Sequence, residues 1–142
     1  MTLPFVFVDT SAWWAYFHRD DQWHHRAVAA MRTLLESRAV LVTTDHVFDE
    51  VVTGLLGRAG HRIAAQAGTG ILKSPSVLLV FVDEPTFREA WRVFEKHDRM
   101  GWSPTDCISM GVMRKREIRR AFSFDTDFEK MGFDLFPGDD ES

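Results

Sequence analysis

Five short apolar runs alternate with longer segments of helical period, and this alternation most constrains how the chain can fold. The runs occupy residues 5–8, 40–43, 77–82, 121–124 and 133–136. Each run is short and is bounded by polar or turn-forming residues, a pattern typical of buried strands. Strands separated by helices need crossover connections, which favour a parallel sheet covered on both faces. We therefore expect an α/β fold, a three-layer α/β/α sandwich with a mostly parallel five-stranded sheet.

Between the runs, apolar residues recur at spacings of three and four, which predicts helices with one apolar face each. The three clearest faces comprise Trp23, Ala27, Ala30, Met31, Leu34 and Leu35; Phe48, Val52, Leu55 and Ala59; and Phe87, Ala90, Trp91 and Phe94. A chain of 142 residues suits a single domain, which we place at residues 1–137. Residues 138–142 are expected to form a short disordered acidic tail.

Charge and apolar content disfavour several classes of protein. The chain has 17 Lys and Arg against 21 Asp and Glu, a net charge of −4, which disfavours a protein that coats nucleic acid through bulk electrostatics. No stretch approaches the roughly 18 consecutive apolar residues of a membrane span. The N-terminus lacks the features of a signal peptide, and the single Cys107 cannot form an intrachain disulfide. We therefore expect a cytoplasmic protein without a membrane partner.

Acidic residues from four separate segments follow predicted strands or begin predicted helices. Asp9 follows the first strand, Asp125 and Asp127 follow the fourth, Glu50 lies in the second turn of a helix, and Asp106 lies at the start of another. In a parallel sheet such positions meet at the carboxyl edge. Clustered carboxylates repel each other unless a cation offsets their charge, and oxygen ligands of this kind suit Mg²⁺ or Mn²⁺.

Each acid also has a purely structural interpretation. Asp9 can cap the next helix, and residues 125–127 can form a turn. Ser103 and Asp106 fit a capping box, with Asp106 at the third helical position. Glu50 can be a solvated surface residue. No single signal is specific, and the metal-site hypothesis depends on all of them predicting one location.

Together these residues resemble the PIN-domain family and, within it, the toxin half of VapBC-type toxin–antitoxin pairs. The resemblance covers nearly the whole chain and is strongest in FVDTSA at 7–12, TTDHVFDE at 43–50, SPTDCIS at 103–109 and AFSFDTDF at 121–128. By position it implies four metal-site acids, which are Asp9, Glu50, Asp106 and Asp125. Asp127 stands at a position that is acidic only in some members. Ser11 and Ser123 match hydroxyl positions near the site, and Ser123 stands where a threonine is more usual.

The resemblance implies Mg²⁺- or Mn²⁺-dependent hydrolysis of RNA without a covalent intermediate, which leaves 5′-phosphate and 3′-hydroxyl ends. Asp9, Asp106 and Asp125 would hold the metal, and Glu50 would ligate a second ion or orient the attacking water. The implied partners are an RNA substrate and a cognate antitoxin protein, and we expect a homodimer. Two other hypotheses are a PIN nuclease that processes RNA without an antitoxin and a catalytically idle PIN-like binding module.

Three further features of the sequence each have more than one interpretation. The basic stretch at 113–120 either complements the dipole of a helix C-terminus or contacts RNA. The aromatic residues within 13–17 either enter the core or form a groove for an antitoxin helix or a homodimer face. His46 lies four residues before Glu50, and His24 and His25 lie in another helix, but no HExxH motif or cysteine partner supports a zinc site.

Overall fold

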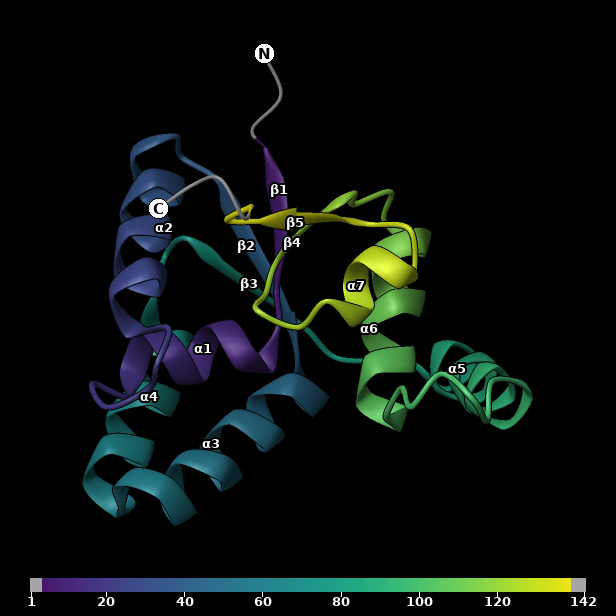
Figure 1. The fold of residues 1–142 in the computed structure, drawn as a ribbon, viewed down its shortest axis with the longest axis horizontal. Coiled ribbons are helices and arrows are strands. Elements are labelled where there is room, and N and C mark those ends of the chain that lie inside the picture. Colours follow the sequence, from purple (N-terminus) through teal and green to yellow (C-terminus); the bar gives the residue numbers. More distant parts are fainter. Residues whose placement is uncertain (1–3, 139–142) are drawn as a thin grey trace.

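The computed structural model describes residues 4–138, in which five strands form one sheet with the order β3-β2-β1-β4-β5 (Figure 1). The strands are β1 Phe5–Val8, β2 Val40–Thr44, β3 Val77–Val80, β4 Arg120–Phe122 and β5 Asp134–Phe136. All four pairings are parallel, so the predicted α/β fold with a five-stranded sheet is confirmed. The acidic tail predicted at 138–142 lies, apart from Gly138, outside the described residues.

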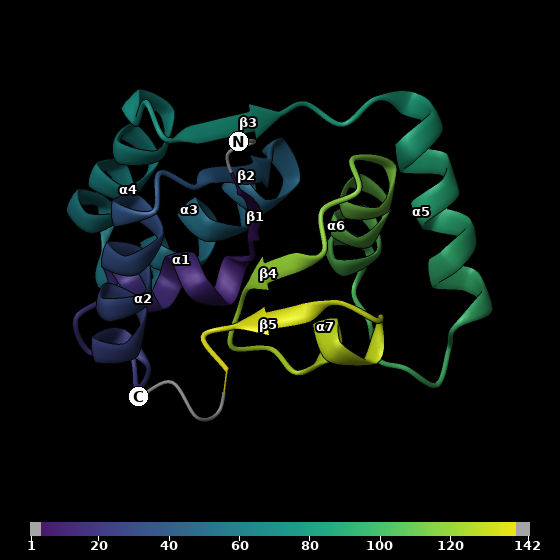
Figure 2. The same cartoon turned by 90° about the horizontal axis from the view of Figure 1, so that it is seen from above.

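Helices cover both faces of this sheet and give the predicted three layers. They are α1 Thr10–Phe17, α2 His24–Glu36, α3 Asp45–Ala59, α4 His61–Lys73, α5 Glu84–Lys96, α6 Pro104–Lys115 and α7 Asp127–Lys130. Figure 2 shows α1 to α4 on one side of the strands and α6 and α7 on the other, with α5 outside α6. Within residues 4–138 no helix is long and apolar enough to cross a membrane.

Two strands are shorter than the apolar runs suggest, because side chains bind the backbone that follows them. β3 ends at Val80. Two residues later, the amide of Val82 donates to Asp45 Oδ1 at 3.1 Å. β4 ends at Phe122, and the amide of Phe124 donates to Ser11 Oγ at 3.0 Å. Both segments thus leave the sheet at its carboxyl edge.

The apolar face of α2 packs largely as predicted. Its buried residues are Ala27, Ala30, Met31 and Leu34. Leu35 is exposed, and Trp23, which lies just before the helix, is 37% exposed. These two residues were therefore wrongly assigned to the buried face.

The predicted face of α3 packs partly against another helix rather than against the sheet. The residues of α3 that enter the core are Val47, Val51 and Leu55. Phe48 and Val52 instead contact α4, where a Cβ added to Gly68 would lie 3.3 Å from each of their side chains. α4 itself was not predicted from the sequence, because its buried positions are small residues such as Ala64 and Ala67.

The predicted face of α5 is mostly exposed, which corrects the expectation that it is buried. Only Ala90 is buried, whereas Phe87 and Trp91 are 48% and 50% exposed. The reason is that α5 packs against α6 and lies outside the sheet layer (Figure 2). Phe81, in the loop before α5, is 74% exposed. We call Phe81, Phe87 and Trp91 the α5 aromatic surface.

The aromatic residues that follow Asp9 serve both the core and a recess. Trp13 is only 2% exposed, and its indole donates to Thr43 Oγ1 at 3.3 Å. Tyr16 and Phe17 are half-buried and, with residues of α2 and α4, line an apolar recess of about 160 Å³. We call this the α1–α2–α4 recess. The core interpretation is therefore confirmed for Trp13, and a partner-binding role for Tyr16 and Phe17 stays a prediction.

Candidate active site

The five predicted site residues all lie at the carboxyl edge of the sheet, in segments that follow β1 and β4 or begin α3, α6 and α7. Asp9 directly follows β1, and Asp125 lies between β4 and α7. Asp127 is the first residue of α7, Asp106 the third of α6 and Glu50 the sixth of α3. The central strands β1 and β4 therefore set the positions of the acids that follow them.

Asp106, Asp125 and Asp127 form the tightest group in this cluster. One carboxylate oxygen from each lies within 4.8 Å of the others. Asp9 and Glu50 are not members of this group, but both interact with Asp106 electrostatically. Burial, followed by the charges of Asp125 and Glu50, raises the pKa of Asp106 above its ordinary value, although hydrogen bonds from Ser103 oppose this.

Asp9 is the most deeply buried acid of the cluster, with only 4% of its surface exposed. Its Oδ2 accepts hydrogen bonds from Ser123 Oγ at 2.9 Å, Ser11 Oγ at 3.0 Å and the Ser11 amide at 3.4 Å. Burial, and then the charge of Asp106, raise the pKa of Asp9 from 3.8 to about 7 despite these bonds. An ionised Asp9 therefore calls for a nearby cation.

Ser11 and Ser123 join the ends of β1 and β4 around Asp9. Their hydroxyls lie 3.2 Å apart, and the Ser11 hydroxyl also accepts from the Phe124 amide. The Ser123 hydroxyl accepts from the Asp125 amide at 2.9 Å. The two serines thus couple the position of Asp9 to that of Asp125, which the resemblance alone did not predict.

The structural interpretations of Asp9, Asp106 and Asp125 also hold, and they are compatible with a metal site. Asp106 forms the predicted capping box, in which its Oδ2 accepts from the Ser103 amide and Ser103 Oγ accepts from the Asp106 amide, each at 3.0 Å. Asp125 Oδ1 accepts from the Asp127 amide at 2.9 Å, as in a turn. In Asp106 and Asp125 alike, the bond that the carboxylate accepts engages one of its two oxygens.

Glu50, rather than its neighbour Asp49, faces the cluster. Thr10 Oγ1 donates a short hydrogen bond to Glu50 Oε1, whereas Asp49 is exposed and its near partner is Thr53 on the same helix. Thr10 is buried and was not predicted as a functional residue. The sequence offered one indication of its role, which is its position directly after Asp9 in the FVDTSA motif.

The donor set suits a hard divalent cation. All its members are carboxylates, supported by hydroxyls, which is the ligand type that Mg²⁺ and Mn²⁺ prefer. Among the described residues, the ion pair at the cluster joins Lys130 Nζ to Asp127 Oδ1 at 3.5 Å. One exposed lysine cannot neutralise five acids, so a bound cation fits this site.

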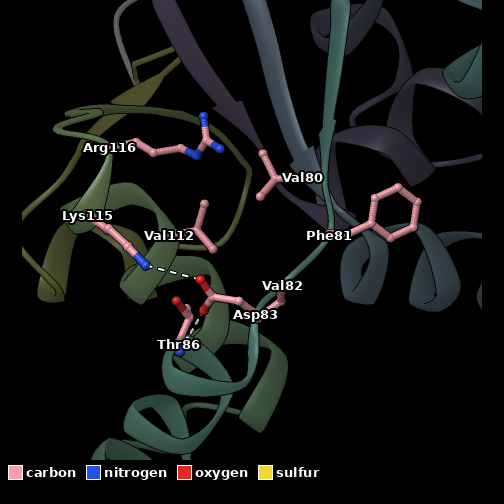
Figure 3. A pocket seen from close by; sticks show the side chains of 8 residues that line it. All are labelled: Val80, Phe81, Val82, Asp83, Thr86, Val112, Lys115 and Arg116. Atoms are coloured by element: carbon pink, nitrogen blue, oxygen red, sulfur yellow. Dashed lines mark hydrogen bonds and ion pairs between the residues drawn. The ribbon is translucent and has the colours of Figure 1, made fainter.

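The basic stretch begins at the opposite end of α6 from Asp106. Lys115 Nζ lies 3.2 Å from Asp83 Oδ2, and both line an open pocket of about 300 Å³ between the end of β3 and α6 (Figure 3). Arg114 donates to the Met131 carbonyl at 3.2 Å. Figure 3 also shows Arg116 beside this pocket and the Phe81 ring pointing away from it. These two contacts of Arg114 and Lys115 are structural, and RNA contact by this stretch stays a prediction.

Comparisons with known proteins agree with this geometry. The chain matches the PIN domain family over residues 6–134. It is 38% identical over 128 residues to the 23S rRNA-specific endonuclease VapC20 of Mycobacterium tuberculosis, in strains CDC 1551 and H37Rv alike, covering 90% of this chain and 95% of the relative. The crystal structure of the M. tuberculosis VapC20, described as a sarcin–ricin loop cleaving toxin, is similar with a TM-score of 0.84 and 35% identity, over 90% of this chain and 95% of that one.

Proposed function

Because this chain belongs to the PIN domain family, we propose that it is a metal-dependent RNA endonuclease and the toxin of a toxin–antitoxin pair. The observation that carries the proposal is the convergence of carboxylates from separate segments on Asp106 at the carboxyl edge of the sheet. The relative that cleaves 23S rRNA supports ribosomal RNA as the substrate class. We accordingly propose that the protein acts in the cytoplasm, where such a substrate lies.

In this proposal Asp9, Asp106 and Asp125 would hold Mg²⁺ or Mn²⁺, and Asp127 would add a ligand from the turn that follows. When bound, the ion would lower the pKa of a water and stabilise negative charge on the phosphate oxygens. Ser11 and Ser123 keep the Asp9 carboxylate in place through its Oδ2. Glu50, held by Thr10, orients the attacking water or ligates a second ion.

The first prediction is that RNA cleavage requires Mg²⁺ or Mn²⁺. Purified protein incubated with ribosomal RNA should produce discrete fragments with 5′-phosphate ends in either ion and no fragments in excess EDTA. Ca²⁺ should bind without supporting turnover, because its coordination is looser. Sequencing of the 5′ ends would map the cleavage site, and undiminished cleavage in EDTA would refute the proposed chemistry.

The two alternative functions make different predictions. An idle binding module would bind RNA without cutting it in any metal, although this chain keeps all four acids of the family site. An RNA-processing nuclease would cleave RNA with no antitoxin encoded beside it. Co-expression of this chain with the product of the adjoining gene would distinguish a toxin from an RNA-processing nuclease, since an antitoxin should suppress cleavage.

The α1–α2–α4 recess is the proposed docking point for the antitoxin. It is apolar, and its lining includes Tyr16 and Phe17 at the end of α1, the helix that Asp9 caps. Its volume of about 160 Å³ suits one large apolar side chain from an amphipathic helix.

The α5 aromatic surface is the proposed homodimer face, in place of the segment around residues 13–17. Large exposed apolar patches on small proteins commonly mark interfaces. Around the rings, Glu84 pairs with Arg88 and Glu89 with Arg92. A two-fold related interface uses the same surface of both chains, so each copy of α5 would contribute Phe87 and Trp91 to it.

The second prediction concerns this dimer. Light scattering of the wild-type chain at micromolar concentration should give the mass of two chains, and Trp91→Lys should give the mass of one, because a buried unpaired charge opposes association. Leu56→Lys, at an equally exposed apolar residue of α3, is the matched control and should stay dimeric. A monomeric wild-type chain, or a dimeric Trp91→Lys variant, would contradict the assignment of this face.

A further inference from the structure

An aromatic stack with a cation beside it lies next to the acid cluster. The rings of Trp23 and Phe124 are parallel within 2°, with centroids 5.5 Å apart. The Arg26 guanidinium carbon lies 5.6 Å from the Trp23 centroid and 5.8 Å from the Phe124 centroid. Trp23 is the outer member of the stack and is 37% exposed, whereas Phe124 is half-buried against Phe122 in the core.

Hydrogen bonds fix the backbone of both residues of the stack. The Trp23 amide donates to Asp21 Oδ1 at 2.8 Å, and the Trp23 carbonyl accepts from the Ala27 amide at 2.9 Å. On the other side, the Phe124 amide donates to Ser11 Oγ, the same hydroxyl that donates to Asp9. The stack is therefore preorganised and tied directly to the active-site network.

We propose that Trp23 stacks on a base of the RNA substrate next to the scissile phosphate, so that it is a positioning residue for cleavage. This inference rests on the proposed endonuclease function. Phe124 directly precedes Asp125, so the stack begins one residue away from the acid cluster. The occupant is a nucleobase because protein recognition of RNA commonly places unstacked bases on aromatic side chains.

Charge supports the same occupant. The cluster of acids repels an RNA backbone wherever metal does not neutralise it. Arg26, whose Nη2 donates to the Gly138 carbonyl at 2.8 Å, places a positive charge beside the ring stack, where it would attract the phosphate of a nucleotide stacked on Trp23. A base held on Trp23 would restrict the position of its nucleotide relative to the acid cluster, which is the contribution that orientation makes to catalysis.

The third prediction tests this contact with a synthetic RNA that spans the mapped cleavage site and carries an abasic ribose at one flanking position at a time. For the wild-type chain, one abasic position should lower kcat/KM by about 10- to 100-fold, the range for loss of one stacked base. Trp23→Ala should show the same loss on intact RNA and no further loss on the abasic RNA. Trp23→Phe, which retains a ring, should keep most of the activity.

Controls separate this inference from general damage and from failure of the proposed function. Phe5→Ala removes an exposed ring at the opposite edge of the sheet and should leave cleavage unchanged. Trp23→Leu keeps apolar cover over Phe124 without an aromatic face and should lose as much activity as Trp23→Ala while melting like the wild type. Full cleavage by Trp23→Ala or Trp23→Leu, or an abasic penalty that persists in these two variants, would overturn the stacking role. No cleavage by the wild-type chain in Mg²⁺ or Mn²⁺ would instead refute the endonuclease function itself.

Discussion

Asp106→Asn is expected to lower RNA cleavage by about 100-fold or more, because loss of a metal ligand should exceed the 10–100-fold effects of residues that only support ligands. The metal-free variant should nevertheless be at least as stable as the wild type. Burial and the neighbouring carboxylates raise the pKa of Asp106, so its negative charge destabilises the folded protein near neutral pH. The asparagine side chain keeps an oxygen that can accept from the Ser103 amide and preserve the capping box.

Asp83→Asn is the matched control for this substitution. Asp83 also lies at a helix start, where its Oδ1 accepts from the Thr86 amide at 2.9 Å, but it is exposed and its other oxygen pairs with Lys115. Hydrogen bonds from Thr86 and then from Lys115 lower the pKa of Asp83 to about 2, the direction opposite to that of Asp106. Asp83→Asn should therefore be slightly less stable and fully active. An Asp106→Asn variant that is destabilised yet fully active would reduce Asp106 to a capping residue.

Local sequence patterns predicted the sheet and the place of the acids because both depend on short-range features. A short run of apolar residues such as 5–8, bounded by polar residues, is typical of a buried strand, and parallel strands bring their following residues to one edge. Asp9 and Asp125 could thus be assigned to the same edge without knowledge of any contact. The capping box at Ser103 and Asp106 was equally local.

Features that depend on what covers a helix could not be predicted in this way. The apolar period of α5 is real, yet most of its face is exposed because the helix packs on α6 rather than on the sheet. α4 was missed for the converse reason, since small residues such as Ala67 and Gly68 bury it without a strong apolar period. Periodicity indicates that one face of a helix is more apolar than the others, but it does not indicate which element packs against that face.

Contacts between distant segments were also beyond the sequence. The bond between Ser123 Oγ and Asp9 Oδ2 joins residues 114 positions apart. Phe124 was predicted to continue β4, but its amide is bound by Ser11, which turns its ring toward Trp23. Each contact requires the strand order β1-β4, which no local pattern encodes.

The stability of the metal-free protein is expected to fall as the pH rises from about 4 to about 7, because of Asp9. Burial and the charge of Asp106 raise the pKa of Asp9 to about 7 in the folded state, against 3.8 as its ordinary value. The folded chain therefore retains this proton more strongly than the unfolded chain, so the stabilisation is complete below the lower value and lost above the higher one. The difference corresponds to roughly 4 kcal/mol of unfolding free energy.

Urea unfolding in EDTA between pH 5 and 8 would measure this effect as the difference between wild type and Asp9→Asn, since other titrating groups are common to both. The variant should be the more stable of the two at neutral pH, and its advantage should shrink toward pH 5. Mg²⁺ should reverse the order near neutral pH, because the cation favours the ionised carboxylate and binds only the folded site. Asp83→Asn, whose carboxyl in the folded wild type titrates near pH 2, should show no such change between pH 5 and 8. A constant difference between wild type and Asp9→Asn across this range, with no response to Mg²⁺, would mean that Asp9 carries no unfavourable charge for a metal to neutralise.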